Sequence, residues 1–399
     1  MSEPTVIVVH MTTATATKFA GTAALAATLL TGTAAPARAD GIDRAELRQV
    51  VEEIAGSGFT GVQVRVSDGR RDWAGSAGVR ELGRPGAPPV NGRFRVGSAT
   101  KTFIATIALQ LVAEGRIGLD EPVAGHLPGY GLDERITLRM LLQHTSGVFN
   151  FTGDYDPDGT LVPGIVWSGG EWVRDRFKTY QPEDLVRLAL SHPLRFTPGT
   201  DWGYSNTNYV LARLLVEEVT GRPFAAELQR RILRPLGMRD TTAPGTSPEI
   251  PGPHAHAYYR YDGRTVDVTR QNPSWIGGGG DMISTTGDLR TFISALMSGR
   301  LLPARLLAEM RTPNAKIGYG LGLFVQDGST PSPFPLPACG TPIVTHNGGV
   351  QGYATMMYST LDGDRTLTAS LTYVDDVAQT QAGAFREAMQ ALIDETFCA

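Results

Sequence analysis

A serine and a lysine three residues apart stand at the start of an apolar segment of this chain. They are Ser98 and Lys101, in the stretch GRFRVGSATKTFIA, residues 92–105. Residues i and i+3 of a helix share a face, so the lysine can take the proton of the serine hydroxyl. The same stretch hints at a phosphate-binding loop, but that motif places a lysine directly after its second glycine, where this chain has the serine. The spacing favours an acyl-transferring hydrolase over a nucleotide enzyme.

The residues after Lys101 make this pair more specific than its spacing alone. Residues 100–114, TKTFIATIALQLVAE, are apolar on nearly every side, which predicts a buried helix that stops at Gly115. Burial disfavours the charged form of a lysine, so Lys101 is expected to act as a base. Gly97 gives the backbone room to turn sharply into this helix. The alternative interpretation is a helix-capping serine beside a surface lysine.

A second candidate segment is GYSNTNY, residues 203–209, just before another predicted helix. Tyr204 and Asn206 flank Ser205, so a phenol and a carboxamide lie together on a loop. The phenol can relay a proton, and the carboxamide can bind the amide of a substrate. Taken alone, the segment would be explained as well by a packed tyrosine and an asparagine helix cap.

A third candidate segment is THNGGVQGY, residues 345–353, at the start of strand-like sequence. His346 and Asn347 precede Gly348 and Gly349, and a further glycine follows. Glycines in a strand indicate that a ligand or another backbone approaches closely. A lone histidine is usually an ordinary core residue, but this density of glycine predicts a site.

Two apparent metal sites lack the spacing that metals need. DYDPDG, residues 154–159, spaces its acids like the start of a calcium loop, but Pro157 intrudes and Ile165 occupies the position of the closing glutamate. His254 and His256 have no further ligands at zinc spacing. We expect no metal and no other cofactor.

Hydrophobic periodicity divides the chain into two similar ends and a helical middle. The first end predicts a helix over 43–56 and a β-hairpin over 59–79 that turns at Asp68-Gly69. The middle predicts helices over 135–147, 182–191, 208–221 and 223–237. The last part predicts strand-like sequence from 318 to 325, strands over 352–361 and 365–374, and a closing helix over 380–397.

These elements predict an α+β fold in which the two ends pair into one antiparallel sheet flanked by the terminal helices. The helical block is then an all-helical insertion and not an independent domain. Residues 40–399 form a single catalytic unit, with an α/β part at about 40–97 and 270–399 and a helical part at about 98–269.

Residues 1–39 are interpreted as a secretory signal peptide. Lys18 precedes an Ala-rich apolar run over 19–35, and the small residues Ala37 and Ala39 predict cleavage after Ala39. The run is too short and too rich in Thr and Gly to span a membrane, and no later segment is apolar enough. Cys339 and Cys398 fit an extracellular location, where an even cysteine count favours one disulfide. The net charge of −4 gives no electrostatic reason to expect nucleic-acid binding.

Together, the three segments resemble the serine penicillin-recognising family of DD-carboxypeptidases, class C β-lactamases and related esterases and D-peptidases. The resemblance is greatest to secreted actinobacterial-type D-alanyl-D-alanine carboxypeptidases, and it covers nearly the whole mature chain. The matching motifs, in order, are SATK, LLQHTSG, YSNTNY, GGGGDMISTTGDL, GYGLGL and HNGGVQGY.

The resemblance implies chemical roles for four side chains. Ser98 would be the acylated nucleophile, Lys101 its base, and Tyr204 the group that passes a proton to the leaving group and helps to activate water. His346 would support the leaving-group side electrostatically. In this family the histidine of LLQHTSG, His144 here, is a framework residue.

The resemblance also implies a set of substrate-binding groups. Asn206 would hold the acyl-side amide, and the backbone N–H groups of Ser98 and Gly349 would form the oxyanion hole. The remaining expected contacts are Asn347, Gly348 and Trp275. The expected ligands are a D-amino-acid peptide or other acyl substrate and, covalently, β-lactams; the expected state is a monomer.

The chain departs from the carboxypeptidase pattern where that pattern grips a terminal carboxylate. Two hydroxyls and an arginine do so in the family, and the matching residues here are Asn347, Gly349 and Phe324. All three lack that chemistry, above all the bidentate fork of arginine. A class C-like β-lactamase, an esterase or a D-amino-acid amidase therefore stays open beside the carboxypeptidase.

Overall fold

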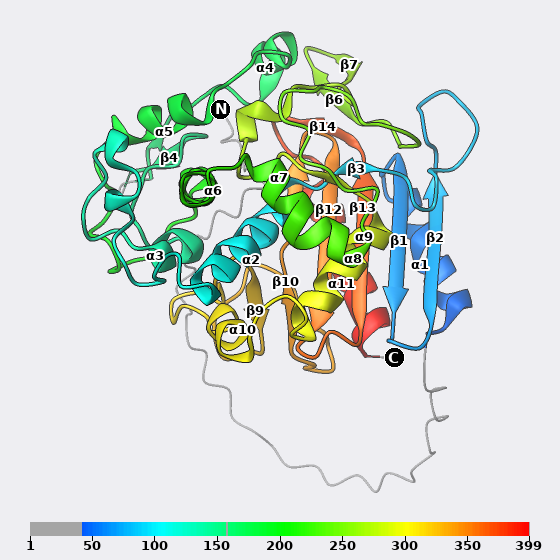
Figure 1. Cartoon of the computed structure of the whole chain (residues 1–399). Helices are drawn as coiled ribbons and strands as arrows, with labels where there is room; N and C mark the ends of the chain where they lie inside the picture. The colour runs from blue at the N-terminus through cyan, green and yellow to red at the C-terminus, as the bar shows by residue number, and fades with distance from the viewer. Residues whose placement is uncertain (1–41, 157–158, 399) are drawn as a thin grey trace, which may run out of the picture.

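An antiparallel sheet assembled from both ends of the chain forms the centre of the molecule (Figure 1). The structure is a computed structural model, and it describes residues 42–156 and 159–398. The strands follow the order β2-β1-β13-β12-β10-β9, and β11 also pairs with β12. Their bounds are β1 Gly61–Ser67, β2 Asp72–Gly78, β9 Phe324–Gln326, β10 Ile343–Thr345, β11 Gly348–Val350, β12 Tyr353–Thr360 and β13 Thr366–Thr372.

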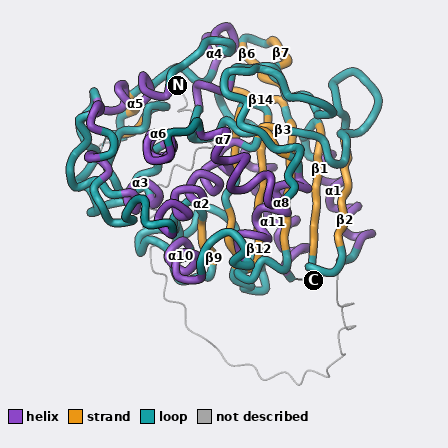
Figure 2. The backbone as a smooth tube through the Cα atoms, viewed as in Figure 1, coloured by secondary structure: helices purple, strands orange, loops and turns teal. Residues whose placement is uncertain are grey.

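The register joins segments that are far apart in sequence. Gly61 pairs with Thr372 and Ser67 with Thr366, so the first strand lies beside the last long one. Every residue of β13 is buried, because helices cover both faces of the sheet. Figure 2 shows helices on both sides of these strands. The pairing of the two chain ends is as the sequence predicts.

The two terminal helices, α1 (Arg44–Gly56) and α11 (Ala382–Phe397), pack together on one face of the sheet. Their apolar side chains, including Leu47 and Leu392, join the strand residues on that face in one core cluster. On the other face, α9 (Thr286–Met297) contacts β12 and β13. A larger cluster there connects the sheet to the helical region.

The helical region holds the buried helix α2 at its centre. This helix spans Thr100–Ala113, preceded by a 3₁₀ turn over Gly97–Ala99, and it packs against α6. The other helices are α3 Leu138–Gln143, α4 Gly169–Asp175, α5 Pro182–Leu190, α6 Asn206–Thr220, α7 Phe224–Leu228, α8 Arg234–Leu236 and α10 Ala304–Met310. A π-helical turn over Gln229–Leu233 joins α7 to α8 into the single helical run that the sequence predicts.

Two predicted boundaries were wrong. The helix expected to reach Gly147 ends at Gln143, because His144 takes a left-handed conformation with φ of 60°. The strand-like sequence before Phe324 is mostly irregular: apart from an isolated bridge between Tyr319 and Phe324, regular pairing in this segment is confined to β9. Periodicity detected the apolar character of that segment but not its lack of ladder hydrogen bonds.

Several short strands, some in the insertion and some outside it, were not predicted from the sequence. A hairpin of β6 (Tyr258–Tyr261) and β7 (Arg264–Asp267) pairs in parallel with β14 (Val374–Asp376). Two smaller pairs join β3 (Phe94–Arg95) to β8 (Ile283–Ser284) and β4 (Asp154–Tyr155) to β5 (Leu161–Val162). The pairing of β14 with β6 connects the end of the central sheet to the insertion.

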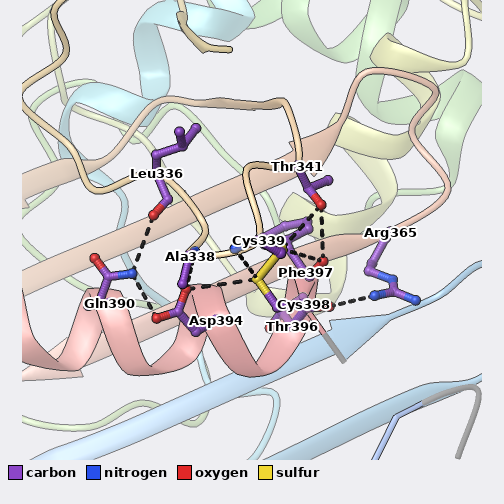
Figure 3. The surroundings of a disulfide bond; sticks show 10 residues. All are labelled: Leu336, Ala338, Cys339, Thr341, Arg365, Gln390, Asp394, Thr396, Phe397 and Cys398. Carbon is purple, nitrogen blue, oxygen red and sulfur yellow. Dashed lines mark hydrogen bonds between the residues drawn. A yellow bond between two sulfur atoms is a disulfide. The ribbon is translucent and has the colours of Figure 1, made fainter. Parts of the chain in front are cut away.

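A disulfide fastens the C-terminal helix to the loop before β10 (Figure 3). Cys339 and Cys398 are 59 residues apart, and their Cα atoms are separated by 5.5 Å. The carboxylate of Asp394 on α11 accepts from the Ala338 backbone N–H and strengthens the same junction. Within the described residues, no helix is both long and apolar enough to cross a membrane. The expected signal peptide lies outside the described residues.

Candidate active site

Ser98 lies in the 3₁₀ turn that leads into α2, where a glycine makes the sharp approach possible. Gly97 has φ of 51°, and a Cβ there would lie 2.6 Å from the nitrogen of Gly349. A Cβ on Gly348 would lie 2.9 Å from the nitrogen of Ser98. The backbones of the turn and of strand β11 are therefore in contact, so the N–H groups of Ser98 and Gly349 lie close together. This is the arrangement expected of an oxyanion hole.

Lys101 is fully buried one helical turn after the serine. Its Nζ lies 3.0 Å from Ser98 Oγ, 2.8 Å from Asn206 Oδ1 and 2.6 Å from the carbonyl oxygen of Gly279. Burial lowers the pKa of Lys101 well below its usual value, while the nearby charge of Asp281 raises it in part. The desolvation effect prevails, so burial shifts Lys101 toward its neutral amine form.

These three contacts define which way the neutral amine points. An uncharged Nζ has two hydrogens and one lone pair. The oxygens of Asn206 and Gly279 can only accept, so they take both hydrogens. The lone pair is left for the hydroxyl proton of Ser98. The contacts thus orient Lys101 as the acceptor that a serine nucleophile requires.

Tyr204 supplies the second polar contact of the serine. Its hydroxyl donates to Ser98 Oγ at 2.9 Å. Burial raises the pKa of Tyr204, so it remains a phenol at neutral pH and can give up a proton only to a developing base. The Nζ of Lys101 lies 5.0 Å from the centroid of its ring.

His144 holds the loop that carries Tyr204. Its Nδ1 accepts from the backbone N–H of Ser205 and from Asn208 Nδ2, each at 3.2 Å. Its ring packs against that of Tyr204 with centroids 4.3 Å apart. The left-handed residue that ends α3 is therefore also the support of the proton relay, in agreement with a framework role.

His346 points toward the same aromatic group from the start of the glycine strand. Its Nδ1 lies 2.8 Å from the carbonyl of Asn347, so this nitrogen carries the proton, and Nε2 accepts from Tyr319 OH at 3.1 Å. Burial lowers the pKa of His346 to about 3, and Lys101 contributes to this shift. The imidazole is neutral at pH 7. Its influence on the leaving group is therefore that of a hydrogen-bonded dipole and not of a full charge.

The remaining predicted contacts divide into two groups. Asn206 and Trp275 line the cavity beside Ser98, and Asn206 Nδ2 also donates to Thr152 Oγ1. The side chain of Asn347 instead donates to Tyr358 OH at 2.7 Å and contacts Met389 of α11. Asn347 also lines the cavity, but its carboxamide nitrogen is used between sheet and helix and is not free to grip a substrate.

The cavity in front of Ser98 has a volume of about 130 Å³. Its walls are largely aromatic and apolar, and among residues 42–156 and 159–398 no lysine or arginine lines it. Phe324 occupies the position where the resemblance would place an arginine, and it packs edge-on against Tyr319 and Phe334. The cavity thus lacks a cation that could grip a carboxylate.

Sequence reasoning missed three groups at this site. The Gly279 carbonyl that orients Lys101 is a backbone atom, so no residue type reveals it. Tyr319, the partner of His346, stands in GYGLGL. That motif indicates the family resemblance but does not show that its tyrosine contacts His346. Asp375 lines the cavity from β14, and the chain order gives no sign that this strand reaches the site.

Comparisons with known proteins agree with this geometry. A family model described as Beta-lactamase matches residues 47–387. A D-stereospecific amidohydrolase from a Streptomyces species is 39% identical, with a TM-score of 0.76, over 89% of this chain and 99% of that one. Esterase EstB of Burkholderia gladioli is 30% identical over 60% of this chain and 65% of its own length. Penicillin-binding protein 4* of Bacillus subtilis is 28% identical over 81% of this chain and 70% of its own.

Coverage of the curated relatives is partial, since this chain spans between 54% and 70% of the length of several of them. The family match, by contrast, extends from α1 into α11 and includes the serine turn, the tyrosine loop and the glycine strand. It therefore covers each of the elements that meet at Ser98. The chain belongs to the Beta-lactamase family of serine hydrolases.

Proposed function

We propose that this hydrolase cleaves D-amino-acid amides and short D-peptides through an acyl-enzyme on Ser98. The observation that carries the proposal is the absence of lysine and arginine from the described cavity wall, with Phe324 in the arginine position. Such a wall suits a neutral leaving group better than a terminal carboxylate. The D configuration is supported by the similarity to the D-stereospecific amidohydrolase.

The proposed reaction uses the contacts around Ser98 directly. Ser98 Oγ attacks the carbonyl carbon while Lys101 takes its proton, and the carbonyl oxygen gains charge between the amides of Ser98 and Gly349. The C–N bond breaks as Tyr204 gives its phenol proton to the leaving nitrogen, and the proton on Lys101 restores the phenol. Water then attacks the ester, and its proton returns to Ser98 as the acid leaves.

A matched pair of substrates tests the choice of leaving group. D-Alanyl-D-alaninamide and D-alanyl-D-alanine differ only in the terminal amide or carboxylate. We expect kcat/KM to be higher for the amide by at least about tenfold, because burying an unpaired carboxylate against Phe324 is unfavourable. A preference for the free acid would contradict the proposal and favour a D-alanyl-D-alanine carboxypeptidase.

The acyl-enzyme itself is tested by intact mass after incubation with benzylpenicillin. We expect an adduct on the native chain and none on Ser98→Ala. An adduct that survives this substitution would exclude Ser98 as the nucleophile. An adduct that forms and is then hydrolysed within the dead time of the experiment would favour a β-lactamase, and the release of penicilloate would reveal it.

Ester hydrolysis is a second candidate function. The apolar wall and the similarity to esterase EstB both favour it. A p-nitrophenyl ester and the p-nitroanilide of the same D-amino acid release the two kinds of leaving group from one acyl-enzyme. Turnover of the ester alone, with no cleavage of the anilide, would support the esterase.

We also propose that the chain is exported and that residues 1–39 are removed. The leader-like sequence and the disulfide between Cys339 and Cys398 support this. Expression of the full chain in a secreting host, with N-terminal sequencing of the protein in the medium, tests it. Asp40 is the expected first residue.

A further inference from the structure

Three residues with oxygen acceptors in their side chains line the cavity in front of Ser98. They are Asp375, Gln351 and Gln379. The Nε2 of Gln351 donates to the Trp167 carbonyl, which fixes its Oε1 as an acceptor. Among the described residues, Gln351 Oε1 and Gln379 Oε1 are buried without a hydrogen-bond partner. Gln351 and Gln379 thus each present an oxygen acceptor that lacks a donor, in the same cavity as the Asp375 carboxylate.

The carboxylate of Asp375 has capacity left after its structural contacts. Oδ1 accepts from the Asp376 backbone N–H at 2.9 Å, and Oδ2 from the Gly352 backbone N–H at 3.4 Å. An ionised carboxylate offers about four lone-pair sites, so two remain. No ion pair joins Asp375 to a basic side chain within the described part of the chain. Burial raises the pKa of Asp375 to about 7, as expected for a carboxyl group without a cation beside it.

The separation between this carboxylate and the reacting carbonyl fits a small substrate. Gly352, which donates to Asp375, follows Gly349 of the proposed oxyanion hole by three residues. Three residues of chain span at most about 11 Å. Tyr204 and His346, which serve the leaving group, belong to the aromatic cluster at the other end of β11. Asp375 therefore lies on the acyl side of the scissile bond.

We propose that Asp375, assisted by Gln351, binds a primary ammonium group on the acyl part of the substrate. An ammonium has three donors and no acceptor, which complements a carboxylate beside unpaired amide oxygens. The inference rests on the proposed amidase function and specifies its substrate class: aminoacyl compounds with a free cationic amine. That amine is either the α-ammonium of the reacting residue or the ammonium of a lysine-like side chain.

Two substrate pairs distinguish these sources in the variant Asp375→Asn, which removes the charge and keeps one acceptor oxygen, enough for the shorter of the two contacts, that with the Asp376 backbone N–H. The first pair is D-phenylalanine p-nitroanilide and its N-acetyl derivative. The second is the p-nitroanilides of N-acetyl-D-lysine and N-acetyl-D-norleucine. We expect Asp375→Asn to lower kcat/KM by about 10- to 100-fold for the cationic member of one pair, through KM, and to change the neutral members by less than about threefold.

Asp376→Asn is the matched control. Asp376 lies on the same strand and its carboxylate caps Thr380, but it does not line the cavity. We expect it to leave the ratio between cationic and neutral substrates unchanged. Equal losses on cationic and neutral substrates with Asp375→Asn, or no loss on either, would overturn the ammonium site.

Failure of the proposed function gives a different result. If the native chain forms no Ser98 adduct with any of the four anilides or with benzylpenicillin, the acyl-enzyme mechanism itself is wrong. If the adduct forms and the neutral members turn over normally, the hydrolase stands and only the assignment of Asp375 is at issue. Unchanged thermal melting of Asp375→Asn confirms that the comparison concerns folded protein.

Discussion

The oxyanion geometry depends on the absence of one side chain, that of Gly97. We expect Gly97→Ala to lower kcat by about 10²–10³, because a Cβ there would push the Gly349 amide out of line. Single-turnover acylation of a D-amino-acid anilide measures the effect. Gly115→Ala is the control: its φ of 69° is similarly strained, but nothing lies within 4 Å of the added Cβ. Loss of stability without loss of kcat is expected there, and equal losses of kcat would contradict the steric explanation.

The basicity of Lys101 depends on a carboxylate that it does not touch. Asp281 is held by Arg213 at 2.9 Å and accepts from the Gly278 N–H in the glycine run that positions the Gly279 carbonyl. Its charge raises the pKa of Lys101 against the effect of burial. Asp281→Asn should therefore lower that pKa further. Because the base must be unprotonated, the acid limb of kcat/KM should move to lower pH with a neutral substrate.

The pH profile of kcat/KM on N-acetyl-D-phenylalanine p-nitroanilide measures this shift, since that substrate does not titrate. His346, whose pKa lies at about 3, stays neutral over the assay range and does not complicate the curve. An acid limb that moves to higher pH, or does not move, would show that Asp281 acts only by supporting the loop.

Residue-level chemistry could be predicted from the sequence where it is carried by residue type and local spacing. Ser98, Lys101 and Tyr204 lie in short motifs that restrict what they can do. The Gly279 carbonyl could not be predicted, because every residue has a carbonyl. The contact of the Asn347 side chain with Met389 could not be predicted either. It depends on which face of the strand packs against α11, and the sequence of the strand does not specify that.

At the scale of elements, a network of ion pairs around the buried Glu227 connects helices of the helical region. Glu227 on α7 is fully buried and bonds Arg230 and Arg231, and Arg231 continues to Glu114 at the end of α2. This network attaches the α7–α8 run to the helix that carries Lys101. The network matters for stability because a buried charge that loses its partner is strongly destabilising.

We expect Glu227→Gln to lower the free energy of unfolding by about 3 kcal/mol, because it leaves the buried Arg231 only partly compensated. Denaturant unfolding measures the change. Asp184→Asn is the control, since the Asp184–Arg187 pair on α5 is more than 60% exposed on both sides and should contribute less than about 0.5 kcal/mol. Similar midpoints for both variants would mean that the buried network does not stabilise the fold.

Element types followed from periodicity, whereas boundaries and short strands did not. The helix before His144 ends early because that residue turns left-handed to meet Ser205 and Asn208, a tertiary requirement that overrides local propensity. The hairpin of β6 and β7 was missed because its strands have only four residues each, too few for a clear alternation of apolar and polar residues. Its pairing with β14, which places Asp375 at the cavity, is a contact across more than a hundred residues.

At the scale of the whole molecule, the disulfide closes the C-terminal part of the chain on itself. In the chain-entropy model, a loop of this length contributes roughly 4 kcal/mol. We expect the double variant Cys339→Ser, Cys398→Ser to lose up to about this much stability in denaturant unfolding. Its kcat/KM should stay within about twofold of the native value, since neither cysteine lines the cavity. A loss of kcat/KM in the folded variant would show that the tether also shapes β10 and His346.

The pairing of β1 with β13 has a consequence for when the enzyme can fold during its synthesis. The two strands are joined across about three hundred residues, so this molecule has a high contact order, and such topologies fold slowly. Ser98 is synthesised early, whereas Gly349 and the strand beside β1 are synthesised last. No nascent fragment can assemble the catalytic centre. Under the export that we propose, the chain would therefore stay without a catalytic centre, and so inactive, until its final strands are available.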